Sequence, residues 1–294
     1  MRLNTANILT IAQKEFADNI YSSRFRALLS IIIVILLSYS VTAAKSGFFA
    51  FEDAIFVTAF TMGSYLPLLG IALGFDAIIK ELVSNSMNIL LAHPVFRDSI
   101  ILGKMAGGFG TLTFAILLSI LSSVGVMLVL SGVSVSLVQI NQVIVFAVIS
   151  LIYLSVFFAL GVLFSVICNN PSKSFIFSMM FWVVFVIMFG PISSFIASVA
   201  TGESVYSENG EHTMELYNKL QYLSPLNHYS QAITGYGLSI DGTDQKVSAG
   251  IFDPEHTLGQ WFKDYWTNLV ELTIIPVLLM VASVLVFMKK DVVR

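Results

Sequence analysis

Six long apolar stretches, each almost free of charged residues, constrain this 294-residue chain more than any other feature. An α-helix needs about 20 apolar residues to cross the hydrocarbon core of a bilayer. The apolar runs are continuous and do not alternate with polar residues, which favours helices over membrane β-strands. The predicted fold class is therefore an all-α integral membrane protein with six transmembrane helices. The predicted spans lie near residues 27–44, 54–75, 100–130, 142–167, 175–200 and 268–288.

The composition argues against several other classes of protein. Charged residues make up 11% of the chain and hydrophobic residues 56%, whereas soluble domains carry about 25% charged residues. The formal net charge of −3 leaves no basic excess to bind nucleic acid. The single cysteine, Cys168, excludes an intrachain disulfide framework. Neither an H-E-x-x-H nor a G-x-x-x-x-G-K-[ST] motif occurs, so we expect no zinc-protease site and no P-loop for ATP in this chain.

Basic residues predict the orientation of the spans, because Lys and Arg concentrate in short cytoplasmic loops of membrane proteins. With a cytoplasmic N-terminus, the predicted inner segments carry eleven of the fifteen basic residues. We therefore expect a multi-pass protein of the cell membrane with both termini in the cytoplasm. The eleven residues are Arg2, Lys14, Arg24, Arg26, Lys80, Arg97, Lys104, Lys173, Lys289, Lys290 and Arg294.

Three segments outside the spans have predicted structures of their own within a single domain, 1–294. Residues 5–24 repeat apolar side chains every three to four positions, which predicts an amphipathic helix in the inner interface of the membrane. Residues 77–99 contain a short apolar helix that is too polar to span and that Pro94 ends, so lipid headgroups or a cytoplasmic partner should cover it. Residues 201–267 form a long extracellular loop.

Ionisable side chains are missing from the middle of every predicted span, and the acids Asp76 and Glu271 lie near span ends. Ion-coupled carriers and intramembrane acid–base enzymes normally hold such groups deep in the bilayer. The energy for any transport is therefore expected to come from another source.

Small and kinking residues are the other notable feature of the spans. Gly103 and Gly107 form a G-x-x-x-G pair, which allows close helix packing either within one chain or between two. Gly190 and Pro191 interrupt the fifth span, where proline removes one hydrogen bond of the helix. They are a candidate hinge, and a static kink is the alternative.

Two segments resemble the permease subunits of type-2 ABC exporters. The first is I-A-Q-K-E-F at residues 11–16, before the first span. The second runs from the acidic residue Asp76 through a leucine pair, a proline and an arginine to an L-G-K sequence at 102–104. The nearest sub-group is the permease of the transporter that serves nitrous-oxide-reductase maturation. The family usually has further acidic residues and Gly-Thr after the position of Glu81, where this chain reads L-V-S-N-S.

The resemblance implies that the chain is the membrane subunit of an ATP-driven transporter. The implied partners are a separate cytoplasmic ABC ATPase, a second permease copy and the lipid bilayer. ATP and Mg would bind the ATPase, so this chain would hold no cofactor and would not itself be an enzyme. The residues expected to couple to the ATPase are Lys14, Glu15, Phe16, Glu81, Leu90, Leu91, Pro94 and Arg97. Glu81 and Arg97 would supply charge contacts, the leucines would insert as apolar side chains, and Pro94 would end the coupling helix.

The expected substrate is a lipid-like, peptide or amphipathic molecule that the transporter exports. One alternative is a membrane relay that transports nothing and passes ATPase-driven motion to an extracytoplasmic partner through residues 201–267. An ion-coupled carrier is a further alternative, against which the missing intramembrane charge counts.

Overall fold

The computed structural model describes most of the chain, and its regular secondary structure is helical, with no strand among the described residues. The predicted all-α membrane class is confirmed, because five described helices are long and apolar enough to cross a membrane. All the predicted spans except the second lie within one of these helices. The five are Ser23–Lys45, Arg97–Leu130, Leu137–Ile167, Pro171–Thr201 and Leu258–Lys289. The described residues are 5–45, 51–83, 96–132, 135–205, 207, 210–235, 250–253 and 256–290.

The predicted second span, 54–75, is divided into two helices, α3 (Phe51–Tyr65) and α4 (Pro67–Gly74). Pro67 has no backbone N–H, so the ladder of hydrogen bonds is interrupted where α3 ends. Leu66, the residue between α3 and α4, keeps helical backbone angles of φ −62° and ψ −29°. Its side chain is fully buried. Neither helix alone is long enough to cross a bilayer, so the sixth crossing stays a prediction.

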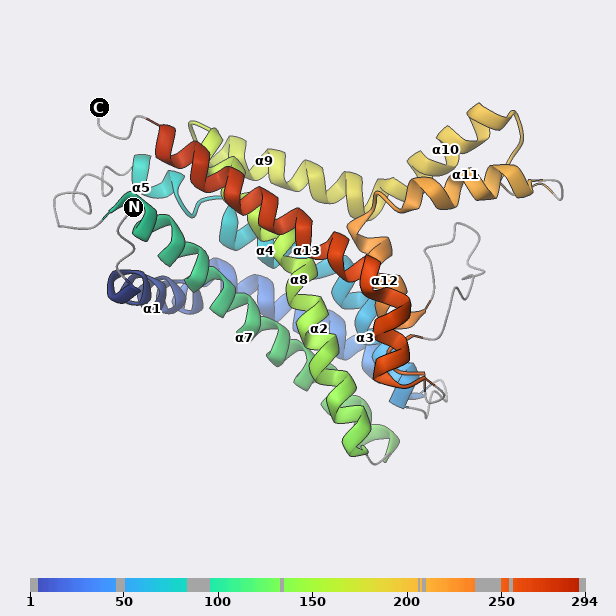
Figure 1. Ribbon diagram of the computed structural model, residues 1–294. Helices are drawn as coiled ribbons and strands as arrows, with labels where there is room; N and C mark the ends of the chain where they lie inside the picture. The colour runs from blue at the N-terminus through green and yellow to red at the C-terminus, as the bar shows by residue number, and fades with distance from the viewer. Residues whose placement is uncertain are drawn as a thin grey trace.

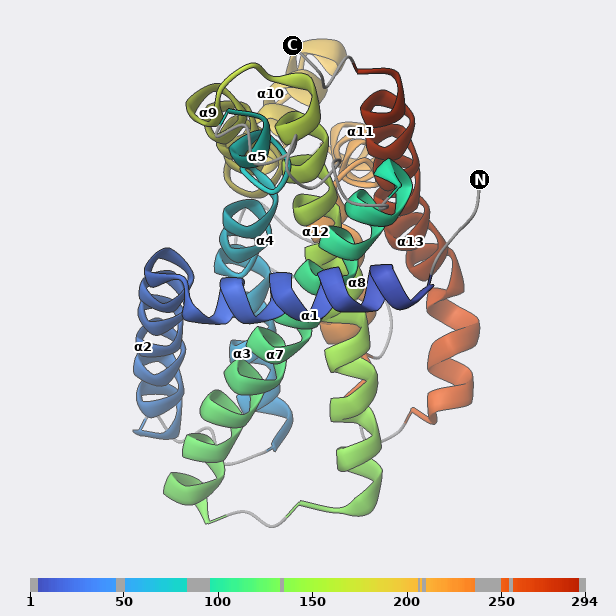
Figure 2. The same cartoon turned by 90° about the vertical axis from the view of Figure 1, so that its left-hand side faces the viewer.

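The first helix, α1 (Thr5–Tyr21), lies across the long helices (Figures 1 and 2). It is seen end-on in Figure 1, whereas Figure 2 shows its length as it crosses α7 (Arg97–Ser131). None of its residues is buried, and Ser22 separates it from α2 (Ser23–Lys45). This is the geometry expected of a helix that lies in the membrane interface.

The helix α8 (Leu137–Ile167) packs against α4, α7 and α13 (Leu258–Lys289), and its side chains form much of the core. Two glycines allow the backbones of α4 and α8 to meet. A Cβ atom on Gly74 would lie 2.5 Å from the carbonyl oxygen of Phe158, and one on Gly161 would lie 3.0 Å from the Cα atom of Gly74. Larger residues at these positions would force the two helices apart.

The fifth predicted span consists of α9 (Pro171–Trp182), the π-helical segment η1 (Val183–Met188) and α10 (Phe189–Thr201). Pro191 has no N–H and its ring crowds the carbonyl group four residues earlier, so a wider π turn just before it relieves an otherwise strained α turn. Gly190 and Pro191 lie in the first turn of α10, separated from the π segment by Phe189. The path of the chain bends between α9 and α10 (Figure 1).

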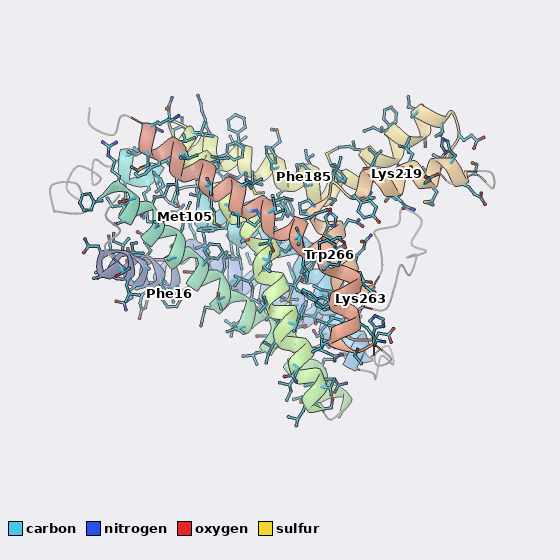
Figure 3. All side chains as sticks on the ribbon, viewed as in Figure 1. Phe16, Met105, Phe185, Lys219, Lys263 and Trp266 are labelled. Carbon is cyan, nitrogen blue, oxygen red and sulfur yellow. The ribbon has the colours of Figure 1, made fainter. Side chains whose placement is uncertain are left out.

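The predicted extracellular loop, 201–267, contains helices. α11 (Glu211–Gln221) packs against α10, the last part of the predicted fifth span, and the two form an arm that projects from the bundle (Figure 1). α12 (Pro225–Thr234) packs on α3 and α13. Figure 3 shows Lys219 on this arm and Lys263 near the start of α13, at the end of the bundle opposite Phe16.

Helix α13 begins at Leu258, ten residues before the predicted sixth span, because a capping box starts the helix there. The Thr257 hydroxyl accepts a hydrogen bond from the N–H of Gln260, whose side chain accepts one from the N–H of Thr257. Trp261 then donates its indole N–H to the carbonyl oxygen of Ala232 at 2.6 Å, which joins this part of α13 to α12.

An ionisable pair joins α13 to α12. Glu271 is near the middle of the 32-residue helix, and its Oε2 atom lies 2.6 Å from Nε2 of His228 on α12. The His228 side chain is buried, whereas that of Glu271 is half exposed. The location of Glu271 near one end of the predicted span 268–288 stays a prediction, because α13 extends ten residues beyond that end of the span.

We expect Gly74→Ala to destabilise the protein, because the new Cβ atom would meet backbone atoms of α8 that no side-chain rotation can move away. Overpacking of this kind costs about 1–3 kcal/mol. The melting temperature can be followed with a maleimide dye that reacts with Cys168, the buried single cysteine, only after unfolding. The matched control is Gly125→Ala, where nothing lies within 4 Å of the new atom. Equal melting temperatures for the two variants would contradict the close approach of α4 and α8.

Candidate functional site

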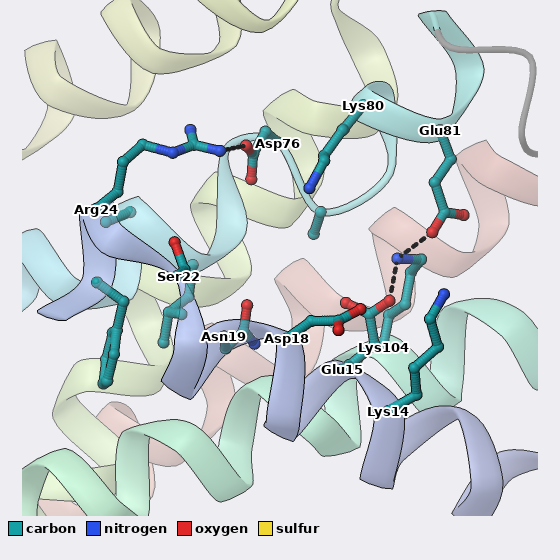
Figure 4. Close-up of a pocket in the computed structure, with 14 residues that line it drawn as sticks. Lys14, Glu15, Asp18, Asn19, Ser22, Arg24, Asp76, Lys80, Glu81 and Lys104 are labelled. Carbon is teal, nitrogen blue, oxygen red and sulfur yellow. Dashed lines mark hydrogen bonds and ion pairs between the residues drawn. The ribbon is translucent and has the colours of Figure 1, made fainter.

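Charged side chains from distant parts of the sequence meet between α1, the end of α4, α5 (Ile79–Val83) and the start of α7 (Figure 4). They line a pocket of about 240 Å³. The side chains carry equal numbers of positive and negative charges, so the pocket is close to neutral overall. The charged residues are Lys14, Glu15, Asp18, Arg24, Asp76, Lys80, Glu81 and Lys104.

Lys104 on α7 is the centre of this cluster. Its Nζ atom lies 2.6 Å from Oε1 of Glu15 on α1 and 2.7 Å from Oε1 of Glu81 on α5. Only 6% of the Lys104 side chain is exposed, and the two acids are 16% and 13% exposed. A charge removed from water needs counterions at short distance. The triad therefore holds three helices together through ionic contacts.

The backbone of α1 comes close enough for this contact because α7 presents two glycines to it. A Cβ atom on Gly103 would lie 2.7 Å from Cβ of Ile11, and one on Gly107 would lie 2.6 Å from Cβ of Glu15. The sequence leaves open whether Gly103 and Gly107 pack within one chain or between two chains. In the structure they pack against α1 of the same chain. Glu15 thereby lies against Gly107, which is about one helical turn from Lys104 on α7.

The start of α5 is fixed from the opposite side by α8. The hydroxyl oxygen of Ser165 accepts hydrogen bonds from the backbone N–H groups of Ile78 and Ile79, at 2.9 and 3.0 Å. These are N–H groups at the start of a helix, which have no partner within the helix itself. Ser165 is completely buried, so α5 is held between α8 and the Lys104 triad.

A second ion pair lies at the junction of α1 and α2. Nη2 of Arg24 lies 2.8 Å from Oδ2 of Asp76, which follows α4. The Arg24 guanidinium also lies 5.6 Å from the ring centre of Phe75, a distance suited to a cation–π contact. The Arg24 side chain is 60% exposed, so this ion pair is more accessible to solvent than the Lys104 triad.

Arg97 takes part in a separate set of contacts where α7 begins and α8 and α13 end. Its Nη1 atom donates to the carbonyl oxygen of Lys290 at 3.2 Å. Lys290 in turn donates from Nζ to the carbonyl oxygen of Val166 at 2.6 Å. Partial burial lowers the pKa of the Lys290 ammonium from its ordinary value. These bonds tie the start of α7 to the ends of α8 and α13.

The predicted ATPase-coupling residues fall into different places. Glu15 and Glu81 meet on Lys104, whereas Lys14 and Phe16 are exposed on α1 and Arg97 contacts the end of α13. The predicted residues outside the described part of the chain are Leu90, Leu91 and Pro94.

The sequence reading did not select Lys104, Arg24 or Ser165 as site residues. A signal for Lys104 was available, because an isolated lysine inside the start of an apolar span requires a nearby acid. Among the described residues, no group of three or more His, Cys, Asp or Glu side chains is placed to hold a metal ion. Five of the eight charged side chains of the site take part in ion pairs between helices or their flanking residues, which suits a joint between helices.

Comparison with known proteins identifies the family. The model of the ABC-2 family transporter protein matches residues 9–292. The probable ABC transporter permease protein NosY of Pseudomonas aeruginosa is 33% identical over 128 residues, which cover 37% of this chain and 46% of that protein. The protein of the same name from Stutzerimonas stutzeri is 27% identical over 135 residues, covering 44% and 49%. The chain thus spans about half the length of these curated relatives. The resemblance to ABC-transporter permeases is confirmed, and the chain belongs to the ABC-2 transporter family.

Proposed function

We propose that this chain is the transmembrane permease subunit of an ATP-driven exporter, that it works with a second permease copy, and that a separate cytoplasmic ABC ATPase drives it. Family membership supports a membrane subunit of an ABC transporter. The observation that carries the coupling part of the proposal is the Glu15–Lys104–Glu81 triad. The triad connects three helices: α5, which precedes the segment that resembles a coupling helix, α1, the proposed interfacial helix, and the long helix α7.

The loop between α5 and α7 is held at both ends in a way that suits transmission of force. Before the loop, Glu81 is bound to Lys104 and the start of α5 to Ser165 of α8. After it, Arg97 contacts the end of α13. An ATPase that pulls on the leucine pair 90–91 would therefore displace α1, α7, α8 and α13 together. ATP and Mg would act in the ATPase, and this chain would convert their effect into a tilt of its spans.

The fifth span supports pairing with a second copy. Only 6% of its most apolar window is buried within one chain, the lowest share among the described candidate spans. Phe181, Phe185 and Phe189 stack along it with ring centres 5.8 and 5.5 Å apart. A second copy would cover the part of this span around Phe181, Phe185 and Phe189, and its bend near Gly190 and Pro191 would let it move during transport. Both termini would lie in the cytoplasm, and the apolar surfaces suit a lipid-like, peptide or amphipathic substrate.

The projecting arm favours one alternative function. α10 and α11 extend away from the bundle (Figure 1), and α11 carries an exposed ion pair between Glu215 and Lys219 at 2.7 Å. Such an arm suits a relay that moves an extracytoplasmic partner and transports no solute. ATP hydrolysis by the complex in vesicles without movement of any solute, together with capture of an outer protein on this arm, would favour the relay.

Leu91→Asp tests the contact with the ATPase. The charged side chain would oppose insertion of this apolar residue into an ATPase groove, so the chain should reach the membrane normally while co-purification of the ATPase is lost. The matched control is Leu137→Asp, an 81% exposed leucine at the start of α8, which should retain the ATPase. Normal ATPase binding and turnover with Leu91→Asp would contradict the proposed coupling helix.

Lys104→Met tests the triad, because it leaves Glu15 and Glu81 facing each other without a cation. Removal of one partner from a buried ion pair costs about 3–5 kcal/mol, so the melting temperature should fall clearly. The triple variant Glu15→Gln, Lys104→Met, Glu81→Gln removes every charge and should recover most of the stability. Solute moved per ATP hydrolysed should remain low in the triple variant, because the ionic contacts between α1, α5 and α7 are absent.

Glu215→Gln is the control for charge removal, since it breaks an exposed pair that lies on α11. It should change neither stability nor transport, because surface ion pairs contribute little. A triple variant that transports as much solute per ATP as the wild type would show that the triad only stabilises the fold.

A further inference from the structure

We propose that the inner end of the bundle binds one membrane glycerophospholipid, with its phosphate beside Arg24 and Lys80 and an acyl chain in an apolar cavity between α2, α4 and α9. The inference depends on the membrane location of the chain and not on which solute is transported.

The apolar half of the proposed site is a cavity of about 600 Å³, within the range of roughly 300–1,000 Å³ that is common for ligand pockets. Ala27 and Leu28 of α2 line one side, and Phe175 and Ile176 of α9 line the other. The Phe75 and Phe175 rings meet edge to face, with their centres 5.2 Å apart. This lining offers few polar groups, so it suits a hydrocarbon chain.

The apolar cavity adjoins the charged pocket of the candidate functional site, because Arg24 and Ala72 line both. The Arg24 guanidinium stands at the boundary. It binds the Asp76 carboxylate in the charged pocket, and it lies over the Phe75 ring at the edge of the apolar cavity. A ligand that fills both spaces therefore needs a polar head joined to an apolar chain.

The charged side chains of the pocket indicate which headgroup the ligand carries. The triad pairs one cation with two acids and therefore carries one net negative charge, whereas Asp76 neutralises Arg24. Among the residues that the structure describes, Lys14, Lys80 and Asp18 also line the pocket and make no ion pair. Their single net positive charge offsets the single net negative charge of the triad, so the pocket is neutral overall, and Lys80 remains as an unpaired cation that a phosphate can contact. Figure 4 shows the Lys80 ammonium pointing into the pocket, on the same side as Asp76. A phosphodiester carries one negative charge and accepts hydrogen bonds from both Arg and Lys.

The depth of the site matches this ligand. Arg24 follows the interfacial helix α1 and lies at the start of α2, so its guanidinium is at the level of the headgroups when α2 spans the membrane. Phe175 and Ile176 are 41% and 62% exposed, so a lipid can enter the apolar cavity sideways from the bilayer.

The first experiment is native mass spectrometry of the complex purified from membranes in mild detergent. The wild type should retain one phospholipid per chain. Ala27→Phe places a ring in the cavity from an exposed position, and it should reduce retained lipid several-fold without loss of the ATPase. Ala200→Phe is the matched control at an exposed alanine of α10 and should retain lipid as the wild type does. Equal retention by Ala27→Phe and the wild type would overturn the proposal.

The second experiment tests the head of the ligand by titrating delipidated complex with phosphatidylglycerol and with diacylglycerol. Diacylglycerol lacks the phosphate, so it should bind about tenfold more weakly, or weaker still. The double variant Arg24→Gln, Lys80→Gln should abolish that difference. Equal binding of the two lipids by the wild type would overturn the assignment of a phosphate to Arg24 and Lys80.

A second copy of the chain is the competing occupant of the apolar cavity. Ile176→Cys distinguishes it, because disulfide cross-linking of two copies in native membranes requires position 176 to lie at their interface. The wild type is the control, since its single cysteine is buried. Efficient cross-linking through position 176 would contradict the lipid site. Because co-purified ATPase is measured in the same preparations, failure of the lipid site is distinguishable from failure of the proposed coupling.

Discussion

The buried ammonium group of Lys104 is the constraint on which the arrangement of the inner end depends. An ion taken out of water costs several kcal/mol unless counterions replace its hydration. Glu15 and Glu81 supply that replacement from two helices that are far from Lys104 in the sequence. As long as Lys104 stays buried, α1 and α5 must therefore stay against α7. The small contact area of α5, a helix of five residues, makes this ionic contact especially important for its position.

Close backbone packing makes the ionic contacts possible. Gly103 and Gly107 allow α1 to cross α7 at short range, and Gly74 and Gly161 do the same for α4 and α8. The charged joint is thus continuous with the packed core of the spans. In a member of the ABC-2 transporter family, such continuity would give the proposed action of an ATPase on the segment between α5 and α7 a physical route to the long helices. The charged pocket and the apolar cavity adjoin each other at the same end of the bundle, where we propose the lipid site.

The sequence predicts the helices well where hydrophobicity alone decides, and less well where local hydrogen bonds decide. The spans at 100–130 and 142–167 follow from uninterrupted apolar residues. The early start of α13 depends on the capping box at Thr257, in a stretch too polar to be recognised as a span. The break before Pro67 and the π segment before Pro191 both arise from a missing N–H, but only the structure shows where the chain adjusts. The coupling role of Leu90 and Leu91 stays a prediction, since these residues lie outside the described part.

The partners of Lys104 were not predictable from spacing, because 89 residues separate it from Glu15. Their meeting depends on the path of α1 across α7. The central claim is that α1 and α5 move as one unit under the action of the ATPase. Spin labels at Leu9 and Val83, both 60% exposed, test it most directly by electron paramagnetic resonance of the complex with and without ATP. We predict an unchanged distance between Leu9 and Val83 within one chain and a changed distance between the Val83 positions of the two copies. A change in the Leu9–Val83 distance on addition of ATP would contradict the account.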